Sequence, residues 1–241
     1  MLYNNTIMWN RVKLKTRAKQ VLTGNYWQAF VAGLVILLAE GSTSGSSGSS
    51  AASGGDKAIE VLPPFILGLI VLGVILFIAL RIFIGFPLEV GGRKFFLRLS
   101  EGERKLGYIG HFFRPGYFAG VWKTMLLRAV YLILWVLLLV IPGIIKWYTY
   151  RMVPYILADN PIIGTKRAIE LSTDMTDGQK FEMFVLDLSF IGWYILGLIA
   201  LGIGVLFVQP YYEATYAELY LHLREHAIAA GITDKAELNK Q

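Results

Sequence analysis

The residues best placed to carry out chemistry lie inside apolar segments. Arg151 and Glu213 are both expected within the bilayer, where an ionisable side chain costs about 2.5–3.5 kcal/mol and tends to be paired or functional. We expect the two side chains to meet, because each lies at a similar depth below the outer end of its own helix. The other members of this candidate intramembrane polar site are Asp187, Gln209, Tyr150 and Tyr212.

Two interpretations of this pair remain open. A structural ion pair would hold two helices together, whereas a ligand site would line a cavity for a cation, a proton or a lipid headgroup. Pro154 and Pro210 lie close to the pair and free backbone carbonyls that could bind an ion. Proline kinks are also common packing features of membrane helices.

A second pattern, His222-Leu223-Arg224-Glu225-His226, places two imidazoles one helical turn apart beside a glutamate, as in a class of zinc peptidases. A zinc site needs a third protein ligand, for which the C-terminal region offers only candidates such as Glu237. His and Arg also suit the C-terminal end of a helix. The chain lacks cysteine, a phosphate-binding loop, a nucleophile elbow and a dinucleotide fingerprint. We therefore predict no catalytic residues, no metal and no cofactor.

The elements that must position these residues are long apolar blocks. Of the 241 residues, 55% are hydrophobic and 17% are charged, against roughly 25% charged in a soluble domain. About 20 apolar residues in a helix cross a hydrocarbon core roughly 30 Å thick. We predict an all-α polytopic membrane bundle, a single domain over 1–241, with six transmembrane helices arranged as three hairpins and with amphipathic inner-surface helices.

The predicted segments differ in length and polarity. The six transmembrane helices are predicted at 21–39, 61–87, 124–141, 144–158, 183–201 and 204–222. An amphipathic surface helix at 6–20 precedes the first of them, and a flexible outer Gly/Ser loop at 40–60 joins the first to the second. The cytoplasmic segments are a basic segment at 88–123, an amphipathic helix and loop at 160–182, and a tail at 223–241. The segment 144–158 is short, and if it does not cross, the C-terminal end lies outside.

Lys and Arg near the ends of spans predict the orientation, because such residues stay on the cytoplasmic side. Residues 1–26 contain Lys and Arg but no Asp or Glu, and 88–123 is rich in both cations, whereas 40–60 contains one Lys and three acidic residues. Both termini are therefore expected in the cytoplasm. The basic residues expected to contact anionic inner-leaflet lipid are Arg11, Lys13, Lys15, Arg17, Lys19, Arg93 and Lys94. Because these cations are expected at the inner leaflet, anionic lipid rather than nucleic acid is the expected partner of this chain, which has a net charge of +6.

The start of the chain and the segment 161–184 follow a common plan, in which a surface helix ends at a glycine and is followed by aromatic residues. Asn160 is the expected N-cap of the second copy, with Pro161 at its first helical position. A looser copy lies at 103–122. We therefore expect three units, each with an inner-surface helix that precedes a hairpin of two spans.

Several strings resemble a family of bacterial integral membrane proteins catalogued as domain of unknown function 975. They are LKTRAKQVLTGNYWQAF, GGRKFFLRLSEGE, LLLVIPGIIKWYTYRMVPYILADNP, FVLDLSFIGWYILG and PYYEATYAELY. The resemblance implies a bacterial plasma-membrane protein with several helices, distantly like the membrane region of some glycerophosphodiester phosphodiesterases. It brings no catalytic residues, and this chain has no soluble phosphodiesterase domain.

These observations give three functional hypotheses. The first is a non-enzymatic membrane protein that engages lipid, a hydrophobic peptide or a partner membrane protein. The second is a small transporter or channel that uses the intramembrane site of Arg151 and Glu213, which would need a water-accessible cavity at mid-depth. The third is a lipid-modifying membrane enzyme.

Overall fold

The computed structural model describes residues 9–40, 64–199 and 202–238. Most of the predicted outer Gly/Ser loop lies outside these residues. The described chain is helical and contains no β-strand, which confirms the all-α prediction. Its helices are α1 (Arg11–Leu22), α2 (Tyr26–Glu40), α4 (Pro64–Leu80), α5 (Phe86–Ser100), α6 (Phe118–Leu138), α7 (Val140–Thr149), α8 (Val153–Asp159), α9 (Thr165–Thr176), α10 (Lys180–Ile199), α11 (Gly204–Ala229) and α12 (Lys235–Leu238).

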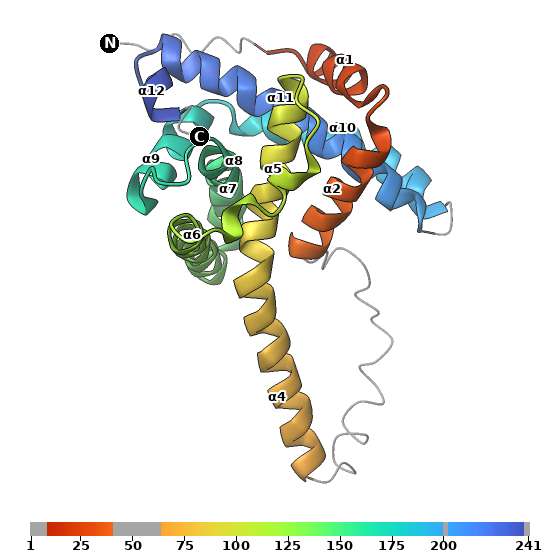
Figure 1. Ribbon diagram of the computed structural model, residues 1–241, viewed down its shortest axis with the longest axis vertical. Coiled ribbons are helices and arrows are strands. Elements are labelled where there is room, and N and C mark those ends of the chain that lie inside the picture. Colours follow the sequence, from red (N-terminus) through yellow and green to blue (C-terminus); the bar gives the residue numbers. More distant parts are fainter. Residues whose placement is uncertain (1–8, 41–63, 200–201, 239–241) are drawn as a thin grey trace.

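The longest helix passes from an exposed apolar end into the core. The described residues Gly68–Ser100 form one helix of 33 residues, which consists of α4 from Gly68 onward, the π-helical segment η1 (Arg81–Gly85) and α5. Figure 1 shows α4 projecting from the bundle, while α5 runs through it. Residues 88–100 were expected in a basic cytoplasmic segment, and the structure instead buries almost all of them in α5.

Glycines on α5 allow its backbone to pack closely against neighbouring segments. A Cβ on Gly91 would overlap the backbone of Ile109, and one on Gly92 would overlap the side chain of Ile36 from α2. Both positions therefore need a residue without a side chain. This close packing places the polar face of α5 in the centre of the bundle.

Helix α11 is the second central element and packs against α1, α2, α5 and α10. Its turn from α10 follows the sequence prediction, since Gly202 has φ of 75° and α11 begins at Gly204. A Cβ on Gly197 of α10 would lie 2.7 Å from the backbone nitrogen of Val205, so this hairpin is tightly closed. On the other side, Gly33 of α2 lies against the backbone of Pro210.

Three helices in the described residues are long and apolar enough to cross a membrane, and the bent pair α1–α2 raises the number to four if it counts as one span. The three are Gly68–Ser100, Phe118–Leu138 and Lys180–Ile199. The six-span hairpin arrangement is therefore not confirmed. The expected span at 21–39 corresponds to α2, which has 15 residues and meets α1 at 112°. The expected span at 144–158 is divided between α7 and α8.

The expectation of three similar units fails for the middle unit. The described segment before α6 contains only the 3₁₀ turns Leu106–Tyr108 and His111–Phe113, where a surface helix was expected. Before α10, the surface helix is α9, which starts at Thr165. Asn160 instead begins a turn, in which its side-chain oxygen accepts a hydrogen bond from the backbone N–H of Ile162 at 3.0 Å.

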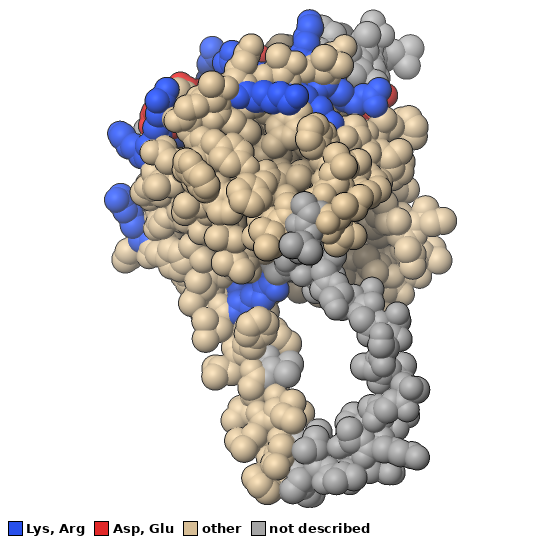
Figure 2. Space-filling view, turned by 90° about the vertical axis from the view of Figure 1, so that its right-hand side faces the viewer, with Lys and Arg blue, Asp and Glu red and all other residues tan. Residues whose placement is uncertain are grey.

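Basic side chains gather at the end of the molecule opposite the free end of α4 (Figure 2). Helix α1 lies at this end (Figure 1) and buries Leu14, Ala18 and Leu22 in the bundle. The cations of α1 that face outward are Arg11, Lys13, Arg17 and Lys19. Lys19, the last of these four cations, also lies over the ring of Tyr211, with its Nζ atom 5.6 Å from the ring centre. We call this set of four outward-facing cations the α1 cationic face.

Candidate functional site

A cavity of about 420 Å³ lies inside the bundle, between α2, α5, α6, α7, α8, α10 and α11. Three arginines and four carboxylates line it, together with three tyrosines and an apolar portion from α5, α6 and α7. We call it the charged cavity. Its ionisable wall consists of Glu40, Glu89, Arg93, Arg128, Arg151, Asp187 and Glu213.

Asp187 on α10 is the centre of one half of this cavity. Its carboxylate accepts hydrogen bonds from Arg151 Nη1 at 3.0 Å, from Tyr148 at 2.9 Å, from Tyr212 at 3.0 Å and from Tyr216. The Arg151 guanidinium also donates to the Tyr212 hydroxyl and lies 4.0 Å from the centre of the Tyr216 ring. Asp187 is thereby held in place by four donors.

Glu89 on α5 is the centre of the other half. It pairs with Arg93 one turn further along its own helix and with Arg128 Nη1 of α6 at 3.3 Å. Arg93 also pairs with Glu40 at the end of α2, and Arg128 Nε donates to the backbone carbonyl of Tyr150 at 3.0 Å. These pairs connect three helices around one buried carboxylate.

Glu213 lies on the same wall but does not pair with Arg151. Its carboxylate accepts hydrogen bonds from Gln209 at 3.0 Å and from the Tyr155 hydroxyl at 3.4 Å. The expected Arg151–Glu213 pair is therefore replaced by Arg151–Asp187 in this structure, with both acids on one cavity. The difference arises because Arg151 lies in the break between α7 and α8, from which its side chain extends toward α10.

Some of the remaining residues predicted for the site contact the charged cavity, and others lie elsewhere in the structure. Gln209 and Tyr212 contact the cavity acids as described, whereas the Tyr150 ring packs near Tyr131 and Lys146 and only its backbone carbonyl contacts the network. Arg93 and Lys94 were expected at the lipid surface. The structure corrects this, because the two residues are only 7% and 3% exposed.

Sequence reasoning missed Glu40, Glu89, Arg93 and Arg128 as members of the polar site. One signal was available for two of them, since Glu89 and Arg93 are spaced four residues apart, which places both on one face of a helix. Both residues reach the cavity because the helix predicted at 61–87 continues through 88–100.

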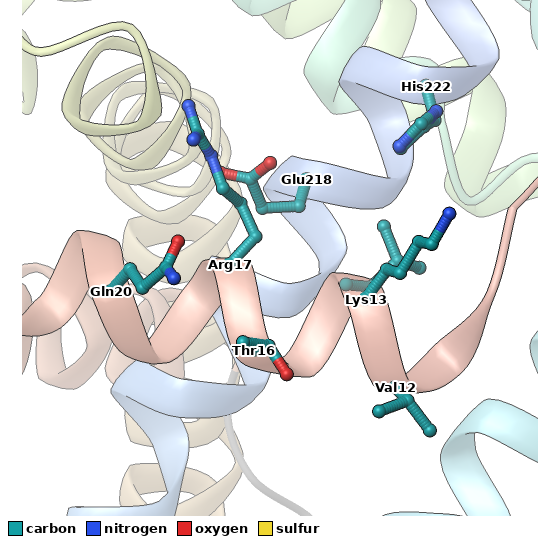
Figure 3. Close-up of a pocket in the computed structure, with 8 residues that line it drawn as sticks. Val12, Lys13, Thr16, Arg17, Gln20, Glu218 and His222 are labelled. Carbon is teal, nitrogen blue, oxygen red and sulfur yellow. The ribbon is translucent and has the colours of Figure 1, made fainter.

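A second, shallower depression of about 390 Å³ lies between α1 and α11 (Figure 3). We call it the α1–α11 groove. Lys13 and Arg17 of α1 face Glu218 and His222 of α11 across it. The partner residue of the earlier peptidase pattern, His226, does not line the groove. Among the residues that the structure describes, no group of three or more His, Cys, Asp or Glu could hold a metal ion.

A polar cluster outside the candidate spans fixes α8 against α11 near the groove. Asp159 accepts hydrogen bonds from Tyr220 and from Arg224 Nη1, both at 2.9 Å, and Arg224 Nη2 also donates to Glu101 at 3.0 Å. Burial raises the pKa of the Asp159 carboxyl, and the neighbouring Arg224 opposes this rise. The cluster therefore stabilises the end of α5, the end of α8 and α11 as one unit.

We predict that Asp187→Asn destabilises the protein by about 3 kcal/mol, because it leaves the Arg151 guanidinium without its paired charge. Unfolding by added denaturing detergent, followed by circular dichroism, measures this loss. The double variant Asp187→Asn, Arg151→Gln should recover part of it. As a control, Asp177→Asn removes an exposed carboxylate and should change stability by less than about 0.5 kcal/mol. Equal effects of the Asp187 and Asp177 variants would contradict the assigned role of the cavity pair.

Comparison with known proteins bears on the second half of the chain, which supplies α6 to α11 and most of the cavity wall. No curated protein and no solved structure matches the chain. Residues 119–227 match the family model described as "Protein of unknown function (DUF975)", and this match supports the family relationship that the sequence strings indicate.

Proposed function

We propose that this chain is a non-enzymatic integral membrane protein that engages anionic lipid through the α1 cationic face. The observation that carries the proposal is the exposure of Arg11, Lys13, Arg17 and Lys19 on α1, the helix that lies at the end of the molecule opposite the apolar α4 (Figure 1). An exposed basic residue near an anionic leaflet contributes roughly 1 kcal/mol. The four cations therefore favour one orientation on such a membrane.

The apolar helices support the same placement. Three described helices are long and apolar enough to cross a membrane, and large apolar side chains of α4 such as Leu69, Leu72 and Phe77 are exposed. Acyl chains, a hydrophobic peptide or a helix of a partner membrane protein would each cover this surface. With α4 in the hydrocarbon region, α1 lies along the interface, as an amphipathic surface helix does.

We predict that replacing all four cations of the α1 cationic face by Gln removes most of the stabilisation that phosphatidylglycerol gives the purified protein. The measurement is the midpoint of thermal unfolding in a neutral detergent as the lipid is added. The matched control replaces four exposed cations of other segments, namely Arg104, Lys123, Lys166 and Lys235. An equal loss in both variants would show that net charge, rather than α1, governs the response.

We also propose a plasma-membrane location, in a bacterium as the family resemblance implies, with six spans and both termini in the cytoplasm. In this arrangement α2, the pair α7–α8 and α11 cross the membrane beside the three apolar spans. The common position of α1 and α12, away from the free end of α4, supports an orientation with both ends of the described chain on one side (Figure 1).

The absence of cysteine makes this topology simple to test by single cysteine substitutions. On intact cells, a membrane-impermeant maleimide should label a cysteine at Ser47 but not one at Lys13 or Lys235. Labelling of all three is expected after the cells are opened. Labelling of the Lys235 position on intact cells would show that the chain crosses the membrane an odd number of times.

The charged cavity favours a second candidate function, a small transporter or channel. Seven ionisable side chains line it, and the carboxylate of Glu213 is held by neutral donors from Gln209 and Tyr155 rather than by a direct ion pair. Such a carboxylate can accept and release a proton or a cation. This function would use the same α11 that also supports the α1 cationic face.

Proton flux into vesicles tests this second candidate. Proteoliposomes with a trapped pH-sensitive dye should acidify faster than empty vesicles when the outside pH is lowered. Glu213→Gln should reduce the rate to that of empty vesicles, because the amide cannot titrate, whereas the exposed Glu225→Gln should leave it unchanged. A wild-type rate equal to that of empty vesicles would remove the proton-transport candidate.

A further inference from the structure

The wall of the charged cavity has one positive charge fewer than it has negative charges. It carries three guanidinium groups and four carboxylates. The ion pairs at the wall use all three guanidinium groups and three of the carboxylates, namely Glu40, Glu89 and Asp187. Glu213 is the fourth carboxylate, and it makes no ion pair within the described part of the chain although it is only 2% exposed. Because a buried negative charge is costly without a positive charge nearby, the cavity favours a cation.

The donors around the cavity do not suit a bare metal ion. Such an ion needs several carboxylate or imidazole groups that converge on one point. The described residues contain no group of three or more His, Cys, Asp or Glu that could hold one. The missing positive charge is therefore better supplied by a cation that needs no ligand cage.

The apolar portion of the wall offers a surface for a hydrophobic body attached to that charge. Phe86 of α5, Leu132 of α6 and Trp147 of α7 line the same cavity as Glu213. Trp147 is also 52% exposed, so its side chain reaches both the cavity and the outer surface of the bundle. The face of an indole ring attracts a cation. The cavity thus combines an unpaired carboxylate with an apolar, aromatic side.

We propose that the charged cavity binds a compact hydrophobic organic cation, of the quaternary ammonium or phosphonium class. Its positive centre lies on the side of Glu213, and its apolar groups lie against Phe86, Leu132 and Trp147. The cavity of about 420 Å³ has the size of a small-molecule site, roughly 300–1,000 Å³. This inference rests on the cavity of the second candidate function and adds a ligand class to it.

The recognition is electrostatic and does not depend on a hydrogen bond from the ligand. Gln209 and Tyr155 already donate to the two carboxylate oxygens of Glu213. Both donors are neutral, so the negative charge stays in place and acts over several ångströms in surroundings of low polarity. A quaternary cation without N–H groups therefore suits the site.

The test measures equilibrium binding of radiolabelled tetraphenylphosphonium to the purified full-length protein in a neutral detergent. Tetraphenylborate is the matched probe, because it has nearly the same size and shape and the opposite charge. The wild type should bind the cation saturably and at least tenfold more tightly than the anion. Glu213→Gln should weaken binding of the cation at least tenfold, or about 1.4 kcal/mol. Glu225→Gln, an exposed change on the same helix, should leave the affinity unchanged.

A second variant keeps the test informative if Glu213→Gln fails to fold. Trp147 is half exposed, and Trp147→Leu retains an apolar side chain while it removes the aromatic face. This variant should weaken binding of tetraphenylphosphonium about two- to fivefold. Binding of tetraphenylborate should not change, because the anion gains nothing from the face of the indole ring.

Two outcomes of the binding measurement would overturn the inference. Equal affinities of the wild type for the cation and the anion would show hydrophobic partition only. Unchanged affinity for the cation in both the Glu213 and the Trp147 variants would place the binding site elsewhere. Proton flux without binding of the cation would overturn the ligand class and leave the transport candidate intact. Binding without proton flux would support the cation site and remove that candidate.

Discussion

Charges buried inside the helix bundle are costly unless opposite charges or hydrogen-bond donors meet them, and this requirement explains how the helices are arranged around α5 and α11. Glu89 would be costly alone, but it meets Arg93 of its own helix and Arg128 of α6. Asp187 meets Arg151 from the break between α7 and α8. The Glu89–Arg128 and Asp187–Arg151 pairs join elements that are distant in the sequence, so moving one of these elements would leave a buried charge without its partner.

The backbones of these helices also approach one another closely. Gly91 and Gly92 bring α5 against Ile109 and α2, and Gly197 closes the hairpin of α10 with α11. Small residues at helix contacts serve this purpose in membranes, where no hydrophobic force drives one apolar helix onto another. The polar network then adds the directional interactions that select one arrangement among many similar ones. Charge pairing and close contacts at glycines thus both contribute to the packing of the helices around α5 and α11.

The sequence predicted the helical class, the turn at Gly202 and the polar character of Arg151, Asp187 and Glu213. It could not predict which acid meets Arg151, because that depends on the break after Thr149 and the direction in which the chain leaves it. It also placed Arg93 at the lipid surface. Counting Lys and Arg assigns a segment to a side of the membrane, and it cannot detect that a cation is paired with Glu89 and Glu40 in the interior.

Helix α11 connects the two polar regions of the molecule. Glu213 faces the charged cavity and Glu218 faces the α1–α11 groove, and their separation of five residues corresponds to about 7.5 Å along the helix axis. A ligand in the groove would therefore contact the same helix that positions the cavity carboxylate. Coupling between the two sites requires that the ligand prefer one position of α11 over another. The ion pair between Arg17 and Glu218, at 3.7 Å, is one contact that a shift of α11 relative to α1 would change.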